Sequence, residues 1–348
     1  MRIVQFEIPG QGRRVGVVAG DEVRDITALE PQWQRVVDVF DVAVEQDQTL
    51  AGILGPLVEE ARNVTFPLDD LLAVSPGQGV PYLQAPLDHA DPHHVLISGT
   101  GLTHTGSMQS RDDMHTAGDK DAAEPMSDSR KMFEMGLEGG RPERGRRGVA
   151  PEWFYKGNGT NLRGHRQMLE VPDFARDGGE EPELVGCYVI DREGIPRRLG
   201  FALGNEWSDH ATEKLNYLYL APSKLRVCSV GPELITDCDF QAVTLGCTVR
   251  REGRVIYDSG TLRSGERHMC HSLANCEDHH FKYPQHRQPG DVHLHYFGTS
   301  KLSYGTRQWT YQEGDEVCIA APDFGSSLVN PIRRNANPEE TPCRILPG

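Results

Sequence analysis

The chain has 348 residues, with 36 lysines and arginines against 51 aspartates and glutamates, which gives a formal net charge of −15. Nucleic acids and anionic membrane surfaces bind basic stripes, so this acidic excess argues against either as the main partner. The sequence has no apolar run of the roughly 18–20 residues that span a membrane and no signal-peptide pattern at its start, so we expect a cytoplasmic protein. Eight cysteines without a Cys-x-x-Cys pair predict reduced thiols.

Residues 1–90 are expected to form a small N-terminal α/β module. Residues 3–8 and 14–19 have the pattern of two strands joined by a Pro-Gly turn, and residues 31–62 carry apolar side chains at helical spacing. A turn-rich stretch then marks the expected domain boundary, which leaves a larger second domain over 91–348.

The second domain is expected to be mostly β. A strand over 95–97 runs into a glycine loop, and a helical and loop excursion follows at about 105–150. Beyond this excursion, strand-like runs are separated by short turns and interrupted by helical stretches at 209–220 and 265–280. The absence of regular strand–helix alternation favours an α+β, mostly β fold with a closed or folded β-roll over a doubly wound sheet.

Three glutamates form the most informative pattern. Glu181 and Glu183 stand two residues apart at the start of a predicted strand, so both side chains leave the same face. If residues 183–190 and 199–205 form a hairpin, Glu206 returns to the same end of the sheet. Such close carboxylates repel unless a cation lies between them, and oxygen ligands suit Mg²⁺, Mn²⁺ or Ca²⁺. A Glu-x-Glu pair alone is common, and a solvated strand start is the alternative.

Lys224 is a candidate for the same site. It precedes an apolar strand and the turn Gly231-Pro232-Glu233. Beside a cation held by three carboxylates, a lysine would orient a substrate oxyanion or take part in proton transfer. On local sequence alone, an exposed lysine is the alternative.

Five segments in a fixed order resemble the fumarylacetoacetate hydrolase superfamily over about residues 93–332. They are a Phe-Tyr-Lys segment, a Glu-x-Glu-Leu segment, an Asn-acid-x-Ser segment, a lysine before a Gly-Pro turn, and a Gly-Asp strand that leads to Gly-Thr. In this chain they are Trp153–Asn158, Glu181–Leu184, Asn205–His210, Lys224 with Gly231-Pro232, and Pro289–Ser300. No single motif is specific, but the five in sequence are.

The resemblance implies a mixed β-roll core, usually a homodimer, with one Mg²⁺ or Mn²⁺. The implied metal ligands are Glu181, Glu183 and Glu206. It places Lys224 at the substrate, and the implied substrate-binding residues are Thr299, Gly298, Tyr155 and Lys156. Substrates in the family are typically 2-keto or 2,4-diketo acids that chelate the metal through a carboxylate and a keto oxygen.

Two departures from the family pattern bear on the reaction. Asp209-His210 stand where the Asn-acid-x-Ser segment of the family usually continues with Ala-Arg, so a common arginine is missing. The hydrolases often carry a His-x-x-Glu pair that activates water; the expected equivalent begins at His104, where Ser107 takes the position of the glutamate. A carboxylate-supported histidine base is therefore in doubt, which favours a non-hydrolytic member.

Within the superfamily the whole chain resembles a bacterial branch linked to dehydration of 2-keto-3-deoxy-pentonates. The expected reaction is a Mg²⁺-dependent dehydration to 2-oxoglutarate semialdehyde in sugar-acid catabolism. The metal would polarise the keto oxygen, a base would remove a C3 proton, and the C4 hydroxyl would leave. Lys224 and His104 are the candidates for proton transfer.

Two alternatives belong to other classes of site or reaction. A Mg²⁺-dependent hydrolase that cleaves a C–C bond in acylpyruvates or 2,4-diketo acids would use the same metal site. A zinc-binding module over 268–280 would use Cys276 and His280, which stand at i, i+4, although a buried helix with satisfied histidines explains this stretch more simply. The sequence contains no Gly-x-Ser-x-Gly motif and no dinucleotide-binding loop.

Overall fold

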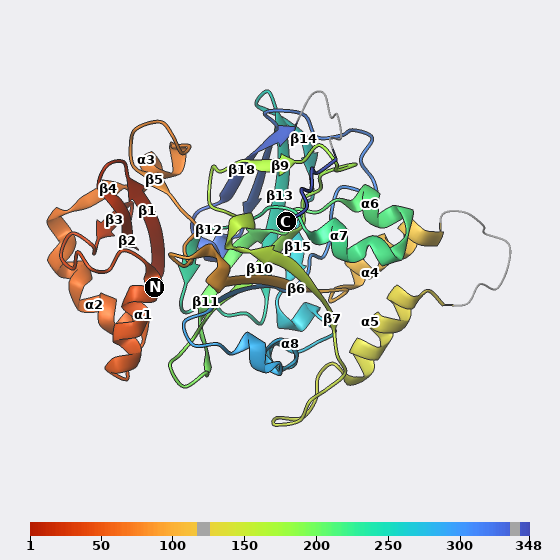
Figure 1. Cartoon of the computed structure of the whole chain (residues 1–348), viewed down its shortest axis with the longest axis horizontal. Helices are drawn as coiled ribbons and strands as arrows, with labels where there is room; N and C mark the ends of the chain where they lie inside the picture. Colours follow the sequence, from red (N-terminus) through yellow and green to blue (C-terminus); the bar gives the residue numbers. More distant parts are fainter. Residues whose placement is uncertain (117–125, 335–341) are drawn as a thin grey trace.

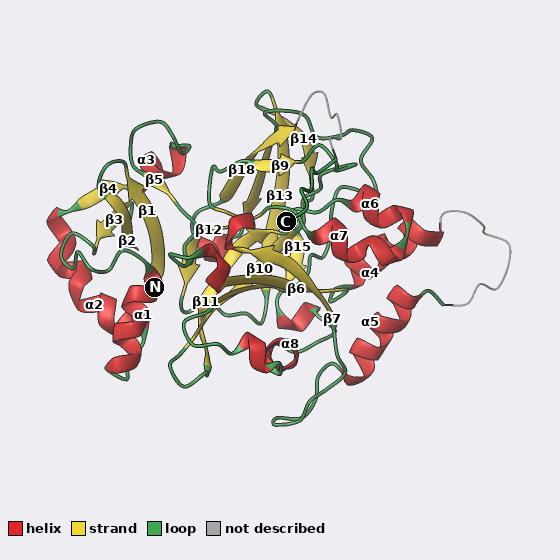
Figure 2. Cartoon of the chain, viewed as in Figure 1, coloured by secondary structure: helices red, strands yellow, loops and turns green. Residues whose placement is uncertain are grey.

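The computed structural model describes residues 1–116, 126–334 and 342–348. Two mixed β-sheets form its centre, and helices pack around them (Figure 2). Part of the predicted excursion at 105–150, namely residues 117–125, lies outside the described residues. The described remainder forms two helices and a loop that leads into the next strand.

Within the described residues the larger sheet has twelve strands, in the order β4-β3-β2-β1-β12-β11-β10-β16-β6-β7, with β5 beside β1 and β8 beside β12. Its strands are β1 (Arg2–Ile8), β2 (Gly12–Ala19), β3 (Glu22–Asp25), β4 (Thr65–Pro67), β5 (Tyr82–Leu83), β6 (Val95–Gly101), β7 (Glu152–Asn158), β8 (Leu162–Arg163), β10 (Pro182–Ile190), β11 (Pro196–Asn205), β12 (Cys228–Ile235) and β16 (Val292–Tyr296). Most neighbours are antiparallel, whereas β16 and β6 are parallel.

The smaller sheet, in the same described part of the chain, has six strands in the order β14-β13-β17-β18-β9, with β15 beside β13. Its strands are β9 (Leu169–Val171), β13 (Val243–Arg251), β14 (Arg254–Asp258), β15 (Leu262–Ser264), β17 (Glu316–Ala320) and β18 (Leu328–Arg334). A hydrophobic core between the two sheets joins Leu184 and Leu203 of the larger sheet to Leu245 and Val317 of the smaller one.

The α-helices are α1 (Val36–Glu45), α2 (Leu50–Glu60), α3 (Leu68–Ala73), α4 (Thr105–Thr116), α5 (Asp128–Gly139), α6 (His210–Leu215), α7 (Leu220–Lys224) and α8 (Leu273–Phe281). Figure 1 shows α1 and α2 beside the N-terminal strands, and α4, α6 and α7 gathered on the opposite side of the molecule. None of the described helices combines the length and apolar character needed to cross a bilayer.

The N-terminal module shares both a sheet and a core with the rest of the chain. β1 pairs with β12, so that Ile3 lies opposite Leu234, and one hydrophobic core contains Ile3, Val36, Val185 and Leu294. The boundary predicted at residue 90 therefore falls in the segment between β5 and β6. The strands on its two sides belong to the same sheet.

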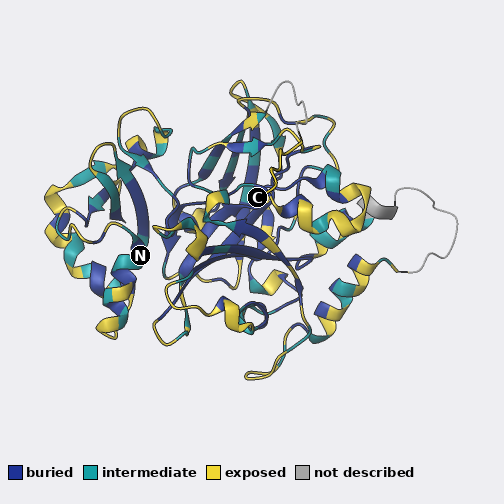
Figure 3. Cartoon of the chain, in the orientation of Figure 1, coloured by how far each residue is buried: buried dark blue, intermediate teal, exposed yellow. Residues whose placement is uncertain are grey.

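β10 lies near the middle of the larger sheet, between β11 and β16, and all nine of its residues are buried (Figure 3). One face packs Val185 and Cys187 against the core shared with the N-terminal module, and the other packs Leu184 against the smaller sheet. Because both faces are covered, the strand is a nearly continuous apolar run instead of an alternating one. Charged groups at its start are consequently removed from water.

Two predicted helices are shorter in the structure. The stretch 209–220 contains α6, then a 3₁₀ turn, then α7 from Leu220. The stretch 265–280 begins with a 3₁₀ turn, and α8 begins only after Ser272, whose side chain accepts a hydrogen bond from Asn275 N. The extended residue Met269, with φ of −99° and ψ of 151°, separates the two parts.

Candidate metal and substrate site

Three buried glutamates meet at the open end of the β10–β11 hairpin. The predicted hairpin is confirmed, since Glu183 lies opposite Gly204 in the register and the chain turns at Gly194, whose φ is 76°. At the open end, one carboxylate oxygen from each of Glu181, Glu183 and Glu206 lies within 4.8 Å of the other two. The structure thus brings the three predicted ligands together.

Backbone groups hold two of these glutamates in place. Glu181 N donates to Asn205 Oδ1 at 3.1 Å, and Gly298 N donates to Glu183 Oε2 at 2.7 Å. The other oxygen of Glu183, Oε1, is buried and has no hydrogen-bond partner among the described residues. A carboxylate oxygen without water or a donor is costly, so this atom marks a position for a cation.

Two buried lysines contact the same carboxylates. Lys224 Nζ lies 2.5 Å from Glu181 Oε1 and 2.7 Å from Glu206 Oε2, and Lys156 Nζ lies 2.8 Å from Glu206 Oε1. Burial lowers the pKa of Lys224, but Glu181 and Glu206 outweigh burial and leave this pKa raised. Lys224 therefore presents an ammonium group to the site.

A narrow cavity of about 20 Å³ lies among these groups, which is enough space for about one ion or water molecule. The charged residues in its lining are Glu181, Glu183, Glu206, Glu213, Lys224 and Arg111. Together with Lys156, which pairs with Glu206, and Glu152, which pairs with Arg111, five carboxylates oppose three cations, an excess of two negative charges when all are ionised. Burial, followed by the charges of Glu206 and Glu181, raises the pKa of Glu183 well above its usual range. A divalent cation balances this excess, so the residues fit Mg²⁺ or Mn²⁺ in both charge and donor type.

Arg111 brings a guanidinium group to the cavity from α4. Its Nη1 lies 2.5 Å from Glu152 Oε2, and its Nε lies 2.9 Å from Glu213 Oε1. Gly101 lies opposite Glu152 in the sheet, and a Cβ at Gly101 would lie 1.8 Å from Glu152 Oε1, so the glycine leaves room for the carboxylate. An arginine thus reaches the cavity from a segment far from Asp209 and His210 in the sequence.

The helix α6 places His210 and Glu213 one turn apart in the cavity lining. His210 Nε2 lies 3.1 Å from Glu181 Oε1, whereas Glu213 pairs with Arg111. Within the described part of the chain no hydrogen bond joins His210 to Glu213. The His-x-x-Glu spacing of residues 210–213 is visible in the sequence, but the two side chains do not pair with each other, and His210 contacts the carboxylate of Glu181 instead.

Strand β16 leads Gly298 and Thr299 into the cavity lining, where the resemblance places them. Gly298 has a φ of 90°, and a Cβ there would lie 2.2 Å from Thr103 Oγ1, so only glycine fits without strain. Thr299 Oγ1 donates to Lys301 O at 2.9 Å, which orients the hydroxyl group.

The Phe-Tyr-Lys segment, Trp153–Asn158, contributes differently from what the resemblance implies. Side chains of β7 alternate, so Phe154 lines the cavity while Tyr155 points away and is 43% exposed. The structure does not bring Tyr155 to the cavity. Lys156 is buried and contacts Glu206, one of the predicted metal ligands, from outside the cavity lining.

His104 is buried but is not part of the cavity lining. Thr103 Oγ1 donates to Phe297 O at 2.7 Å and therefore accepts from His104 Nδ1 at 2.9 Å. His104 Nε2 then carries no proton and has no partner among the described residues. Burial lowers the pKa of His104 to about 4. The structure leaves this candidate proton carrier outside the cavity lining, which Leu102 joins two residues earlier in the chain.

The histidine- and cysteine-rich stretch over 268–280 forms no second metal group within the described residues. His280 instead belongs to a cluster of four buried imidazoles, which we call the histidine cluster: His280, His286, His293 and His295. Trp153 Nε1 donates to His280 Nδ1 at 3.2 Å, so His280 Nε2 donates to His293 Nδ1 at 2.9 Å. The geometry of the described residues therefore does not support the zinc alternative.

The chain is similar to known proteins in sequence and in fold, although no family model matches it. A curated relative from Haloferax volcanii, a probable 2-keto-3-deoxyxylonate dehydratase, is 27% identical over 331 residues, which cover 94% of this chain and 97% of the relative.

Solved structures share the fold over almost the whole chain. A 2-keto-3-deoxy-D-arabinonate dehydratase in complex with magnesium and 2,5-dioxopentanoate matches with a TM-score of 0.66 and 16% identity, covering 97% of this chain and 100% of its own. A maleylpyruvate hydrolase from Sphingobium sp. SYK-6 with manganese(II) and pyruvate matches with a TM-score of 0.56 and 17% identity, covering 96% and 99%. The predicted α+β fold of the fumarylacetoacetate hydrolase type is confirmed.

Proposed function

We propose that this protein is a Mg²⁺- or Mn²⁺-dependent dehydratase that converts a 2-keto-3-deoxy-pentonate into 2-oxoglutarate semialdehyde and water. The observation that carries the proposal is the buried cluster of three glutamates, with its two excess negative charges and the unpaired Oε1 of Glu183. The curated relative supports the proposal, because it is named as a probable dehydratase of this substrate class and its similarity covers nearly the whole of both chains. The fold shared with a dehydratase solved with magnesium and 2,5-dioxopentanoate supports it further.

Glu181, Glu183 and Glu206 would hold the ion. When bound, the ion supplies positive charge that polarises the C2 keto group and stabilises negative charge on its oxygen. Lys156 and Ser208 keep Glu206 in place, since Ser208 Oγ donates to Glu206 Oε1 at 2.9 Å.

The reaction has a simple atom balance. A base removes a proton from C3 and the C4–O bond breaks, so that the hydroxyl leaves with a proton as water. A proton then moves from C5 to C3, and the enol at C5 becomes the aldehyde. Lys224 presents hydrogen-bond donors to the cavity and is the residue we assign to the departing hydroxyl or the substrate carboxylate.

A direct assay tests the reaction. The metal-depleted protein is given Mg²⁺ or Mn²⁺ and a 2-keto-3-deoxy-pentonate of either C4 configuration, and 2-oxoglutarate semialdehyde is measured by mass spectrometry. We expect product only when a divalent ion is present. Absence of product with both configurations would contradict the proposal.

The runner-up is hydrolysis of acylpyruvates or other 2,4-diketo acids at the same glutamates. The presence of His210 and Glu213 in the cavity lining favours it, but Arg111 engages Glu213, and His210 contacts Glu181, one of the three glutamates that would hold the ion. Release of pyruvate from an acylpyruvate, with the deoxy acid untouched, would establish the hydrolase instead.

We also propose that the protein acts in the cytoplasm as a homodimer. β7 is an edge strand of the larger sheet, and α7 packs beside it. Large apolar side chains are exposed on these elements and around them, namely Trp153, Tyr155, Leu215, Leu218, Tyr219 and Leu225. An exposed apolar patch of this kind marks a contact surface.

Light scattering tests the dimer. It should give a dimer for the natural chain and for the control Val255→Glu, at an exposed position, and a monomer for Leu218→Glu. A monomeric natural chain would contradict the proposal.

A further inference from the structure

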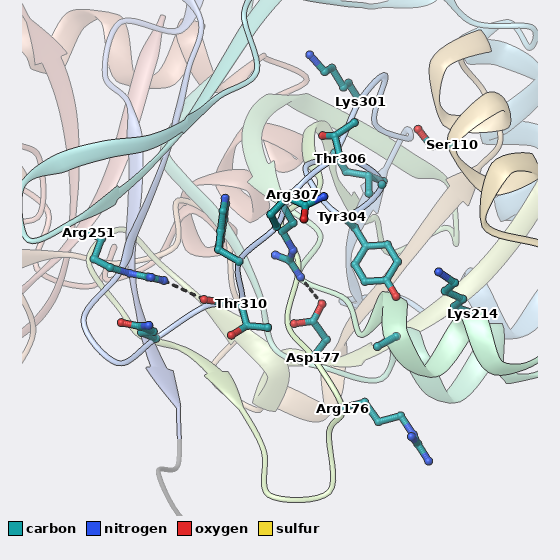
Figure 4. Close-up of a pocket in the computed structure, with 16 residues that line it drawn as sticks. Ser110, Arg176, Asp177, Lys214, Arg251, Lys301, Tyr304, Thr306, Arg307 and Thr310 are labelled. Carbon is teal, nitrogen blue, oxygen red and sulfur yellow. Dashed lines mark hydrogen bonds and ion pairs between the residues drawn. The ribbon is translucent and has the colours of Figure 1, made fainter. Parts of the chain in front are cut away.

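An open hollow of about 960 Å³ adjoins the metal cavity. The loop after β16 supplies most of its lining, and α4, α6, β13 and residues 176–177 supply the rest. Figure 4 shows Arg307 and Tyr304 in the middle of this hollow; around them lie Lys214, Arg176, Arg251 and Lys301.

The hollow and the metal cavity share a wall. Ser110 of α4 and Leu302 line both spaces. Tyr304 lines the hollow, and its ring centre lies 5.2 Å from that of His210, which lines the cavity. A five-carbon acid is much larger than the 20 Å³ of the cavity, so it must reach the glutamates from an adjoining space.

The hollow is strongly cationic in composition. Its lining contains five lysines and arginines but only one carboxylate, Asp177. Arg307 pairs with Asp177, and Arg251 pairs with Asp315 at 2.8 Å, so these two cations are neutralised.

The other three cations of the lining are paired with no carboxylate among the described residues. Lys301 Nζ donates to the carbonyl of Ser259 at 2.9 Å, a neutral partner. Arg176 and Lys214 are exposed, and no ion pair joins either side chain to a carboxylate in the part of the chain that the structure describes. Three uncompensated positive charges therefore surround one hollow in a chain whose net charge is −15.

We propose that this hollow is the entry site for the anionic substrate, with Arg176, Lys214 and Lys301 drawing the carboxylate of a 2-keto acid toward the passage between Ser110 and Leu302. A concave surface lined by one sign of charge concentrates the opposite ion and accelerates its capture, and salt screens this effect. The identity of the acid rests on the proposed function, whereas the cations act on any small 2-keto acid.

Charge removal tests the proposal. The variants are Lys214→Gln, Arg176→Gln and their combination, and the matched control is Arg62→Gln, an exposed cation of the N-terminal module. For the combined variant we expect kcat/KM to fall about three- to tenfold at low salt, with kcat unchanged and with the difference lost near 0.5 M salt. The control should match the natural chain. An unchanged kcat/KM at low salt, or a loss confined to kcat, would overturn the entry site.

A binding measurement separates this inference from the reaction. Pyruvate serves as an unreactive 2-keto acid, and calorimetry measures its binding to the magnesium-loaded protein. If the combined variant weakens pyruvate binding while no deoxy acid is turned over, the entry site stands and the dehydratase falls. If turnover occurs but neither pyruvate binding nor kcat/KM responds to the variant, the entry site falls alone.

Narrowing the passage tests its position. Ser110→Phe should lower kcat/KM at least about tenfold while the affinity for Mg²⁺ stays at its natural value, because Ser110 contacts none of the three glutamates in the described hydrogen-bond network. Natural turnover in Ser110→Phe would show that substrate enters elsewhere.

Discussion

Glu183 illustrates how a few atoms prepare the end of the sheet for a cation. One of its oxygens accepts a hydrogen bond from Gly298 N, and the other has no partner among the described residues. Burial and two neighbouring carboxylates oppose its ionisation. A bound divalent ion would compensate both the burial of the Glu183 carboxylate and its repulsion by Glu181 and Glu206. The affinity for the ion should therefore depend strongly on this side chain.

Replacement of Glu183 by glutamine should therefore raise the dissociation constant for Mg²⁺ at least about 100-fold and abolish turnover. Calorimetry with Mg²⁺ and electron paramagnetic resonance with Mn²⁺ both measure this. Glu170→Gln, at a half-buried carboxylate on β9, is the matched control and should leave affinity unchanged. Full metal affinity in Glu183→Gln would refute the metal site.

Lys224 and His104 should differ sharply when replaced. Lys224→Met removes an ammonium group from the cavity and should lower kcat about 10²- to 10⁴-fold. His104→Asn changes a group behind the wall and should lower kcat less than about tenfold. Thermal unfolding measured on both variants separates loss of activity from loss of structure. A greater loss of kcat in His104→Asn would return His104 to the reaction.

Some site residues could be predicted from the sequence and others could not. Glu181, Glu183 and Glu206 lie on one hairpin, so strand periodicity and a turn signal were enough to bring them together. Arg111 reaches the cavity through contacts with Glu152 and Glu213, far along the chain, and no local pattern encodes such pairing. Strand periodicity over residues 152–158 already puts Tyr155 and Phe154 on opposite faces of β7, so the sequence indicates that only one of the two faces the cavity.

At the scale of elements, the histidine cluster lies where β6, β16 and α8 meet. His295 contacts Ser98 and Thr100 of β6, and His293 carries a buried Nε2 without a partner among the described residues. No ion pair joins the four imidazoles to a carboxylate within these residues. Burial, followed by neighbouring histidines, lowers the pKa of His293 and of His295 to about 3.

This cluster should make the fold sensitive to acid. The folded pKa lies below the unfolded value of about 6.5, so the unfolded chain binds more protons and stability falls as the pH drops below about 6.5. Between pH 7.5 and 5, His293 and His295 should each remove on the order of 2 kcal/mol of unfolding free energy. Urea unfolding at both pH values measures the loss.

His293→Leu should show a smaller loss between the two pH values than the natural chain. The exposed His268→Gln is the control and should lose as much as the natural chain. An equal loss in all three proteins would place the acid sensitivity outside the cluster.

At the scale of the whole molecule, the N-terminal module and the second domain share a sheet. The β1–β12 pairing joins residues more than 230 positions apart, and the core behind it draws from both parts. The sequence predicted the module and the order of its elements, but nothing local in β1 specifies a partner so distant. The overall fold could be predicted because five motifs follow one another in the order typical of the resembling family. The pairing of distant strands could not be inferred from the sequence.

Because the core is shared, both parts should unfold together. Hydrogen exchange should give opening free energies for amides of β1 and of β10 that agree within about 1 kcal/mol. Ile3→Ala, at the fully buried contact between the parts, should lower both by about 2–4 kcal/mol. Loss of protection in β1 alone would show that the module opens independently.

The lysines at the glutamate cluster also bear on how the protein acquires its ion. Many metal sites take shape only on metal arrival. Here Lys224 and Lys156 hold Glu181 and Glu206 through direct ion pairs, so the positions of these two carboxylates do not depend on an ion alone. Oxygen ligands held in this way accept several hard divalent ions, and the choice among them then follows which ion is abundant around the protein. Freshly isolated material should carry magnesium or manganese in proportions that follow the growth medium.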